Sequence, residues 1–386
     1  MKYFIISSLL STALSVGFFV QEFTKGNLTP SMLNGILILT PETSGTHWTD
    51  KLATAYGSSA CSTGCTIDIP DSVADDGSAT TPILPDNVHI RFTGSATFGD
   101  CIITMGRYSS AENVGHAVLQ HHGSNCTGFT YSTQATLQTG DSPRLVNVKI
   151  DCNNQPNSTG ILFGAASTKL VTRESEADHC TNSGLELLGG QFTRHYADSF
   201  WDDTVAIKIY TVLGGGGGNS NEFHGIVGTN GTVGVVLNDN GGSALGMTAN
   251  IFDDCNFINN AVAQYASKQL YLVSSFTVQS GTTETTGSTA SATIDGFTIS
   301  NAAIYIFGPG SATLENFYNA DAIRSPWAVL RNGARINIVN SGGYGNGSGA
   351  WTDTDATSTA AFFGSFINVP NATKMTGTGT LITNIQ

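Results

Sequence analysis

The chain is short of charge. Only 12% of its 386 residues are Asp, Glu, Lys or Arg, which is about half the usual share. Helical proteins carry charged residues on their exposed faces, so this deficit argues against a mainly helical fold. Hydrophobic residues still make up 40% of the chain, enough to exclude disorder and to form a large buried core. The composition therefore favours a β-protein whose surface consists of Asn, Ser, Thr and Gly.

Several functional signatures are also missing. The chain has no Gly-x-Ser-x-Gly nucleophile motif, no P-loop and no dinucleotide fingerprint. Its 16 basic residues are outnumbered by 29 acidic ones, which gives a net charge of −13. Such a surface repels nucleic acid and anionic membranes, so we expect neither as a partner. It also repels polyanionic polysaccharides, unless a local basic cleft or bound cations reverse the field.

The N-terminus predicts export. Lys2 precedes a mostly apolar stretch of 17 residues, from Phe4 to Val20, which is typical of a signal peptide or a retained membrane anchor. We therefore assign residues 1–25 to a signal peptide or anchor and expect a secreted, extracellular protein. Contact with a membrane is expected only if this segment is kept as an anchor.

Seven cysteines in an exported chain predict disulfides and one unpaired thiol. Cys61 and Cys65 are spaced to close a small loop. Four more cysteines could form two further pairs, with a connectivity that the sequence leaves open: Cys101, Cys126, Cys152 and Cys180. Cys255 would then be left over. We expect at least one disulfide, with Cys61–Cys65 and Cys152–Cys180 as the leading candidates.

Periodicity along the chain predicts a solenoid. The segment from Thr46 to Tyr56 has helical spacing, but from about Leu145 onward the chain consists of short β-runs that end at Asn, Asp or Gly. Similar phrases, such as Asp-Cys-Asn and Asp-Asp-Cys-Asn, recur at intervals related to a coil of twenty-odd residues. We predict an all-β fold: a right-handed parallel β-helix (solenoid) with a short N-terminal capping helix.

The expected segments are an N-terminal part with the capping helix at 26–80, the parallel β-helix at 81–340, and a C-terminal cap or tail at 341–386. The alternative is an antiparallel sandwich or barrel, which needs tight hairpin turns. Asn230-Gly231 and Asn332-Gly333 would serve, but most of the β-runs lack such a turn.

Charge gathers in one region. The 36 residues from Arg173 to Lys208 contain ten charged side chains, together with aromatic rings. Carboxylates can move protons, and flat rings can contact the apolar faces of a sugar. The candidate substrate-binding residues in this region are Trp201, Tyr196, Arg194, Lys208, Asp178 and Glu186. A solvated face with ion pairs between coils is the alternative explanation for the cluster.

Two short motifs point to a family. Trp201-Asp-Asp-Thr-Val-Ala-Ile207 is followed 21 residues after Asp203 by His224 in Phe-His-Gly. This resembles polygalacturonases (glycoside hydrolase family 28) in the pectate-lyase-like β-helix superfamily. The resemblance implies that Asp202, Asp203 and His224 are catalytic. The family's earlier aspartate is missing at Asn182-Ser183, and its late Arg-Ile-Lys motif is missing too.

The acidic pair also has a physical consequence. Adjacent strand residues point to opposite faces, so Asp202 and Asp203 can both be exposed only at a bend or strand end. We expect both to line one groove with His224 on the adjacent coil. In an inverting hydrolase one carboxyl protonates the leaving oxygen and another activates water. Asp178 or Glu186 on the preceding coil could supply the second carboxyl.

Three functions follow. The first is a glycoside hydrolase acting on a polysaccharide or surface glycan, without a cofactor or metal. The second is a polysaccharide lyase that uses Ca²⁺, with base Arg173 or Arg194 and carboxylate ligands from Asp178, Asp198, Asp202 or Asp203. The third is a non-catalytic surface β-helix, such as an adhesin, a glycan-binding protein or a spike-like structural protein.

Overall fold

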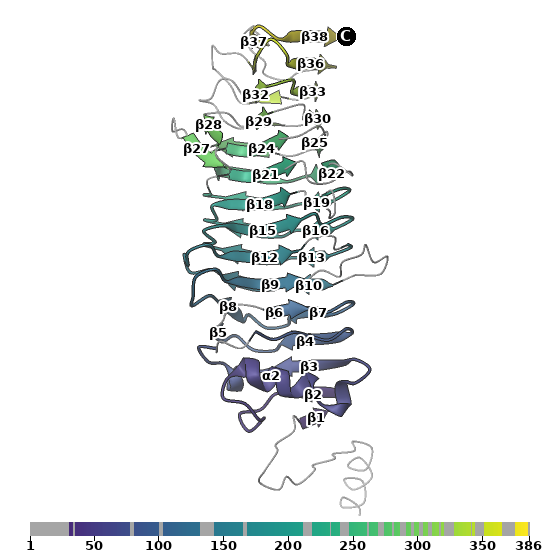
Figure 1. Ribbon diagram of the computed structural model, residues 1–386, viewed down its shortest axis with the longest axis vertical. Helices are drawn as coiled ribbons and strands as arrows, with labels where there is room; N and C mark the ends of the chain where they lie inside the picture. The colour runs from purple at the N-terminus through teal and green to yellow at the C-terminus, as the bar shows by residue number, and fades with distance from the viewer. Residues whose placement is uncertain are drawn as a thin grey trace, which may run out of the picture.

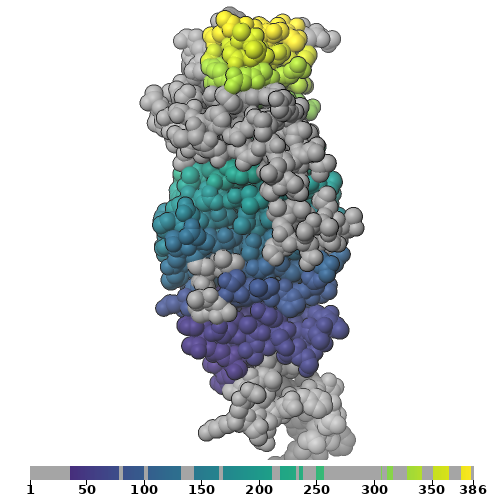
Figure 2. Space-filling model, in the orientation of Figure 1, coloured from purple at the N-terminus to yellow at the C-terminus, as the bar shows by residue number. Residues whose placement is uncertain are grey.

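The structure is a computed structural model. It describes residues 31–384 except 34, 78–80, 100–102, 132–142, 165–167, 211–217, 232, 240–246, 261, 269–273, 280–281, 286–290, 295–296, 301–303, 308–310, 316–317, 320–327, 341, 344–350 and 365–374. The chain winds into an elongated parallel β-helix, with the earliest and latest described strands at opposite ends (Figures 1 and 2). The predicted fold class is confirmed.

Three long sheets form the faces of the rod, here named A, B and C. Sheet A contains β1 (Ser31–Leu33), β2 (Ile36–Ile38), β3 (Cys65–Ile69), β4 (Val88–Phe92), β7 (Ser110–Asn113), β10 (Arg144–Val146), β13 (Val171–Arg173), β16 (Arg194–Tyr196), β19 (Glu222–His224), β22 (Met247–Asp253), β25 (Ser274–Gln279), β30 (Ser311–Glu315), β33 (Arg335–Val339), β36 (Thr359–Phe363) and β38 (Thr380–Asn384).

Sheet B contains β6 (Ile103–Met105), β9 (Thr127–Tyr131), β12 (Thr159–Phe163), β15 (Ser183–Leu188), β18 (Val205–Tyr210), β21 (Val233–Asp239), β24 (Val262–Lys268), β29 (Ile304–Phe307), β32 (Ala328–Arg331), β35 (Thr352–Thr354) and β37 (Met375–Gly377). Sheet C contains β5 (Thr97–Gly99), β8 (Val118–Gln120), β11 (Lys149–Asp151), β14 (Glu176–Asp178), β17 (Ser199–Trp201), β20 (Val227–Thr229), β23 (Asn256–Asn260), β26 (Thr282–Thr285), β31 (Tyr318–Asn319) and β34 (Gly342–Gly343).

Strand pairing is parallel throughout these sheets except at β1–β2, and a separate pair, β27 (Ser291–Ile294) with β28 (Phe297–Ser300), is antiparallel. Parallel pairing begins where β2 meets β3 and continues to β36 and β38. The described coils therefore extend beyond both limits expected from the sequence, residues 81 and 340. The 341–386 segment adds strands to the stack instead of only closing it.

The core follows from side-chain alternation. Each short strand turns its central residue inward. The equivalent central residues of neighbouring coils therefore stack on one another. On sheet A, Ile90 lies against Ala111, which lies against Leu145, and all three are buried. Further along, the rings of Phe223 and Phe252 stack with centroids 4.6 Å apart. Each Å² of apolar surface that these rows bury stabilises the rod by about 25 cal/mol.

The corner between sheets A and C consists of only two residues, and it recurs from coil to coil. Its first residue adopts a left-handed backbone in five successive coils: Asn147, Glu174, Ala197, Gly225 and Asp254. Its second residue is buried in the same coils: Val148, Ser175, Asp198, Ile226 and Cys255. The left-handed residue turns the chain sharply, and the buried one anchors the turn to the core.

One α-helix stands at the N-terminal end of the described stack (Figure 1). Helix α2 (Trp48–Tyr56), with His47 as its N-cap, confirms the predicted helix. The Trp48 indole donates a hydrogen bond to the Gly99 carbonyl at 2.8 Å. The Trp48 ring also packs edge-on against Phe98, with centroids 5.5 Å apart. Short 3-10 turns follow at Ser59–Cys61 and Asp71–Val73.

Both leading disulfide candidates are confirmed. Cys61 bonds to Cys65, and Cys152 bonds to Cys180 on the next coil. Cys255 is a buried free thiol, as expected. The predicted signal or anchor at residues 1–25 lies outside the described residues. No helix in the described part of the chain is long and apolar enough to cross a membrane.

Candidate functional site

The nine residues predicted from the sequence do not form one site. Sheet C and the corner after it hold Asp178, Trp201 and Asp202; sheet A holds Arg194, Tyr196 and His224; sheet B holds Glu186 and Lys208; and the interior holds Asp203. The predicted groove shared by Asp202, Asp203 and His224 is therefore absent, and each group has its own partners.

Asp202 and His224 lie on opposite sides of sheet C, one after its strands and one before them. His224 ends β19, directly before the corner that leads into sheet C, and its coil partner is Tyr196. Asp202 follows β17, and its amide bonds to Thr229 at the far end of β20. The expectation failed because it took 21 residues as one coil, whereas equivalent residues of these coils are 28 apart, as Thr193 and Asn221 show.

Asp203 is buried, with only 1% of its surface exposed, so it does not line an exposed groove. Its Oδ1 accepts a hydrogen bond from the Cys180 amide at 2.7 Å, and its Oδ2 has no hydrogen-bond partner among the described residues. Burial raises the pKa of Asp203 well above its ordinary value. The carboxyl joins two coils from the inside, one coil beyond the Cys152–Cys180 disulfide.

Asp198 is a second buried acid, at the inner corner position described above. It accepts hydrogen bonds from the Thr172 hydroxyl and, at 2.9 Å, from the Ser175 amide. Burial raises the pKa of Asp198 to about 7 and lowers the pKa of the nearby buried His195 to about 3. Burial thus favours the uncharged form of both groups. A Ca²⁺ ligand role for Asp198 or Asp203 does not fit this burial.

The sheet A and sheet B candidates are paired on their own faces. On sheet A, Arg194 lies 3.3 Å from Glu222, and the Tyr196 ring stacks on His224 with centroids 5.3 Å apart. On sheet B, Asn182 links the two predicted residues, since its amide donates to Glu186 at 2.7 Å and its oxygen accepts from Lys208 at 2.5 Å. Neither set reaches Asp178.

The outer face of sheet C brings charged residues together from three successive coils. One row runs through Asp151, Asp178 and Trp201, which pair directly on β11, β14 and β17. The parallel row runs through Lys149 and Glu176. Neighbouring strands are about 4.8 Å apart, so the carboxyl groups of Asp151 and Asp178 start from adjacent points on one surface.

Hydrogen bonds hold Asp151 in its charged form. Gln120 donates to its Oδ2 at 2.9 Å, and the Asn153 amide donates to its Oδ1 at 2.8 Å. His179 Nδ1 lies 3.3 Å from the same Oδ1, and its Nε2 lies 3.8 Å from Asp202. Burial alone would raise the pKa of Asp151, but these hydrogen bonds outweigh it and lower the pKa below its ordinary value.

The pKa of Asp178 is shifted in the opposite direction. Burial, followed by the neighbouring Glu176 carboxylate, raises the pKa of Asp178 to about 7. Its side chain is only 15% exposed, and Lys149 Nζ, 3.8 Å away, offsets part of the effect. Lys149 lies closer to Glu176, at 2.5 Å, and that hydrogen bond raises the pKa of the lysine. The positive charge of Lys149 therefore stabilises the carboxylate of Glu176 more than that of Asp178.

Two neighbouring carboxyl groups with pKa values moved in opposite directions can serve as an acid–base pair. At neutral pH Asp178 can hold a proton while Asp151 remains ionised. Beside them the Trp201 ring is 42% exposed, which is unusual for so large an apolar side chain and provides a flat surface for a sugar ring.

A hollow of about 360 Å³ lies at the corner between sheets A and C, and neither Asp151 nor Asp178 is among its lining residues. It is lined by Asn113, Gly115, His116, Val118, Asn147, Val148, Lys149, Glu174 and Glu176. Lys149 and Glu176 belong both to this hollow and to the charged face, so the two are continuous. We call the charged face, from Lys149 to Asp202, the sheet C site.

Asp178, Trp201 and Asp202 were predicted as site residues from the sequence, whereas Lys149, Asp151 and Glu176 were not. Asp151 was noticed only as part of a recurring Asp-Cys-Asn phrase. Within the described residues, no group of three or more His, Cys, Asp or Glu side chains is arranged to hold a metal ion.

Comparisons with known proteins agree with the fold. No protein-family model and no curated protein sequence matches the chain. Among solved structures, it is similar to the catalytic unit of a thermostable GH87 alpha-1,3-glucanase from Streptomyces thermodiastaticus, with a TM-score of 0.56 and 12% identity over 94% of this chain and 71% of that one. It is also similar to the A-module of the mannuronan C-5 epimerase AlgE4 from Azotobacter vinelandii, with a TM-score of 0.53 and 11% identity over 88% of this chain and 93% of that one.

At such low identity these similarities establish the fold alone. The chain has the parallel β-helix architecture predicted from its sequence. The closer resemblance to polygalacturonases stays a prediction.

Proposed function

We propose that this protein is a secreted glycoside hydrolase that cleaves a polysaccharide at the sheet C site. The observation that carries the proposal is the pair Asp151 and Asp178, adjacent on neighbouring strands, with pKa values shifted in opposite directions. Asp178 acts as the general acid and Asp151 as its ionised partner. These roles replace those that the family resemblance gave to Asp202, Asp203 and His224.

The spacing of the pair favours retention of configuration. Retaining glycosidases hold their two carboxyl groups about 5 to 5.5 Å apart, and inverting ones about 6.5 to 9.5 Å apart. Side chains paired across one inter-strand step, about 4.8 Å, fit the shorter distance. Asp178 would protonate the glycosidic oxygen while Asp151 attacks the anomeric carbon. Water would then hydrolyse the glycosyl–Asp151 ester, with Asp178 now acting as the base.

Other observations support a carbohydrate substrate outside the cell. Trp201 provides an apolar platform beside the acid pair. The hollow at the corner between sheets A and C shares Lys149 and Glu176 with the same charged face. The two structural neighbours are named for action on a glucan and on mannuronan. Disulfides between coils are typical of exported proteins, which supports secretion.

The test is a panel of neutral and acidic polysaccharides, assayed for reducing ends and for absorbance at 235 nm. We expect reducing ends without absorbance from at least one polysaccharide. Asp178→Asn and Asp151→Asn should each abolish that release, while Asp253→Asn, a half-exposed carboxylate on sheet A, should not. Absorbance at 235 nm would favour the lyase, and a protein that binds glycans without cleaving them would be the non-catalytic surface β-helix.

The same pair sets the expected pH dependence. The acid form of Asp178 is lost as the pH rises through about 7, so kcat should fall above neutrality. On the acidic side kcat should stay high until Asp151 becomes protonated, below the ordinary range of an aspartate. A rate that rises steadily from pH 6 to pH 9 would exclude Asp178 as the acid.

A further inference from the structure

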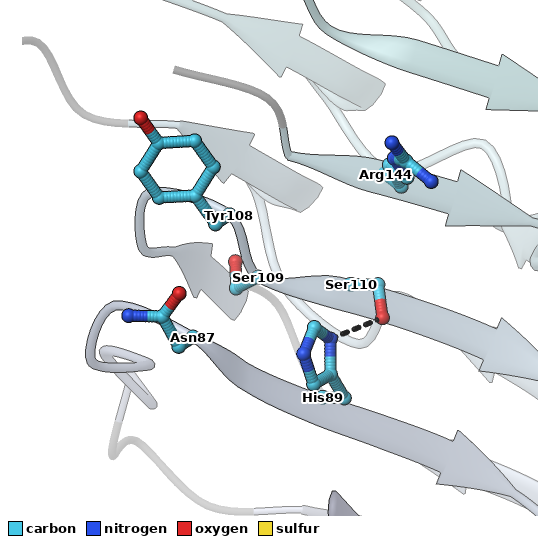
Figure 3. A pocket seen from close by; sticks show the side chains of 6 residues that line it. All are labelled: Asn87, His89, Tyr108, Ser109, Ser110 and Arg144. Carbon is cyan, nitrogen blue, oxygen red and sulfur yellow. Dashed lines mark hydrogen bonds between the residues drawn. The ribbon is translucent and has the colours of Figure 1, made fainter. Parts of the chain in front are cut away.

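A separate pocket lies on sheet A, nearer the N-terminal end of the rod. It has a volume of about 540 Å³ and is lined by Asn87, His89, Tyr108, Ser109, Ser110 and Arg144. His89, Ser110 and Arg144 occupy one outward row, because Ser110 pairs with His89 on one side and with Arg144 on the other. Figure 3 shows the side chains from these three strands and from the turns before β4 and β7 around a common opening.

The chemistry of this pocket differs from that of the surrounding surface. None of its six lining residues is acidic, although acidic residues outnumber basic ones by 29 to 16 in the chain. The nearby carboxylate of Asp86 is already occupied by Arg107, 2.6 Å away. Arg144 is exposed and has no ion-pair partner among the described residues. An unpaired guanidinium in a cleft is a ready site for a carboxylate or a sulfate, which it can bind through two hydrogen bonds.

The remaining polar groups are arranged as further donors. His89 Nδ1 lies 2.8 Å from the Ser110 hydroxyl (Figure 3). Burial, and then the charge of Arg144, lowers the pKa of His89, so the ring is neutral at pH 7. If Ser110 donates to Nδ1, the proton of the neutral ring is on Nε2 and is free to be donated. The Tyr108 ring is 48% exposed beside it, and its hydroxyl can donate as well.

We propose that this pocket binds the anionic group of an acidic sugar, either a uronate carboxylate or a sulfate ester, within the polysaccharide that the protein recognises. This inference rests on the proposed function and names its substrate class. Because Arg144 supplies a single charge and the protein as a whole is acidic, the pocket suits a glycan with sparse negative charges. A densely charged polyanion would be repelled elsewhere on the surface.

The pocket can act together with the sheet C site. Arg144 on β10 and Lys149 on β11 belong to the same coil, separated by the two-residue corner. The hollow that contains Asn147 and Lys149 lies at this corner. A glycan held by Arg144 can therefore continue around the edge of the rod toward Asp151 and Asp178.

Calorimetric titration of the full chain tests the inference. The probes are a xylan oligosaccharide with a single glucuronate, a carrageenan disaccharide with a single sulfate, and neutral maltotriose. We expect at least one acidic probe to bind, to bind more weakly as salt rises from 50 to 500 mM, and to lose at least tenfold in affinity in Arg144→Ala. The control is Arg335→Ala, an exposed arginine of sheet A many coils away, which should bind like the wild type.

The outcomes separate this inference from the proposed function. Unchanged affinity in Arg144→Ala, or failure of both acidic probes to bind, would overturn the acidic-sugar pocket even if the protein cleaves a neutral glucan. Arg144-dependent binding without cleavage of any polysaccharide would keep the pocket and overturn the hydrolase. A folded Arg144→Lys variant with intermediate affinity would identify the two-pronged guanidinium as the binding group.

Discussion

The sheet C face and the corner that follows it both contain aspartates with raised pKa values, but these aspartates have different surroundings. Asp178 lies on the outer face with Lys149, Glu176 and an exposed tryptophan beside it. Asp203 lies inside the corner, where a backbone amide fixes one oxygen and no water reaches the other. A raised pKa alone therefore does not mark a site in this fold. What distinguishes Asp178 is that an oppositely shifted carboxyl lies next to it on an accessible surface.

The largest expected contrast is in activity. Asp178→Asn should lower kcat by about 10² to 10⁴-fold, because an amide cannot deliver the acid proton. Asp203→Asn should change kcat less than threefold, because its side chain cannot reach a substrate. Steady-state kinetics on the substrate found in the panel, with melting curves to confirm folding, make the comparison. Equal losses in the two variants would show that the corner takes part in the chemistry.

The second contrast concerns stability. Replacing both Cys152 and Cys180 by Ser should lower the free energy of unfolding by about 3 to 4 kcal/mol, since the bond closes a loop 28 residues long. The Cys61–Cys65 bond closes only 4 residues, so its removal should cost about 2 kcal/mol. Denaturant titration gives both values. A larger loss from the shorter loop would mean that native strain, not chain entropy, dominates these bonds.

A smaller effect is expected at the aromatic platform. Trp201→Ala should raise KM about tenfold and leave kcat within threefold, because the ring binds the sugar without touching the reacting bond. Phe192→Ala provides the control, since Phe192 is also exposed, at 53%, but does not lie on sheet C. A large fall in kcat with unchanged KM would instead make Trp201 part of the positioning of the acid.

The smallest effect should appear in the pH dependence of stability. The folded-state pKa of Asp203 is raised, so the protein binds its proton more tightly when folded. That contribution is complete below the unfolded pKa, about 3.9, and is lost as the pH rises through the folded pKa. Asp203→Asn lacks it, so the melting temperature of the wild type should fall by a few degrees relative to the variant between pH 4 and pH 8. Parallel curves would show that Asp203 does not titrate abnormally.

The fold could be predicted from the sequence because the coils repeat a similar local pattern: a short β-run that commonly ends at Asn, Asp or Gly. The helix at Trp48 was predicted from its helical spacing, and the disulfides from the cysteines of a chain expected to be exported. Asp178 and Trp201 were found because they lie within one charged stretch.

The rest of the site could not be predicted because it depends on register between coils. Equivalent residues are 27 apart from Lys149 to Glu176, 23 apart from Ser175 to Asp198 and 28 apart from Thr193 to Asn221. A single assumed coil length therefore aligns the wrong residues, as it did for Asp203 and His224. Asp151 falls beside Asp178 only once the true length of that coil is known.

The Cys152–Cys180 bond has a mechanical consequence. In a rod whose coils pair only with their neighbours, a pulling force on the two termini extends the chain coil by coil. The 28 residues between the bonded cysteines cannot contribute to that extension while the bond is intact. Because an extended chain spans at most about 3.3 to 3.6 Å per residue, the molecule with this bond intact should reach a contour length shorter by roughly 90 to 100 Å than a Cys152→Ser/Cys180→Ser variant. Asp178 lies within the segment spared from that force, and Asp151 lies directly before it.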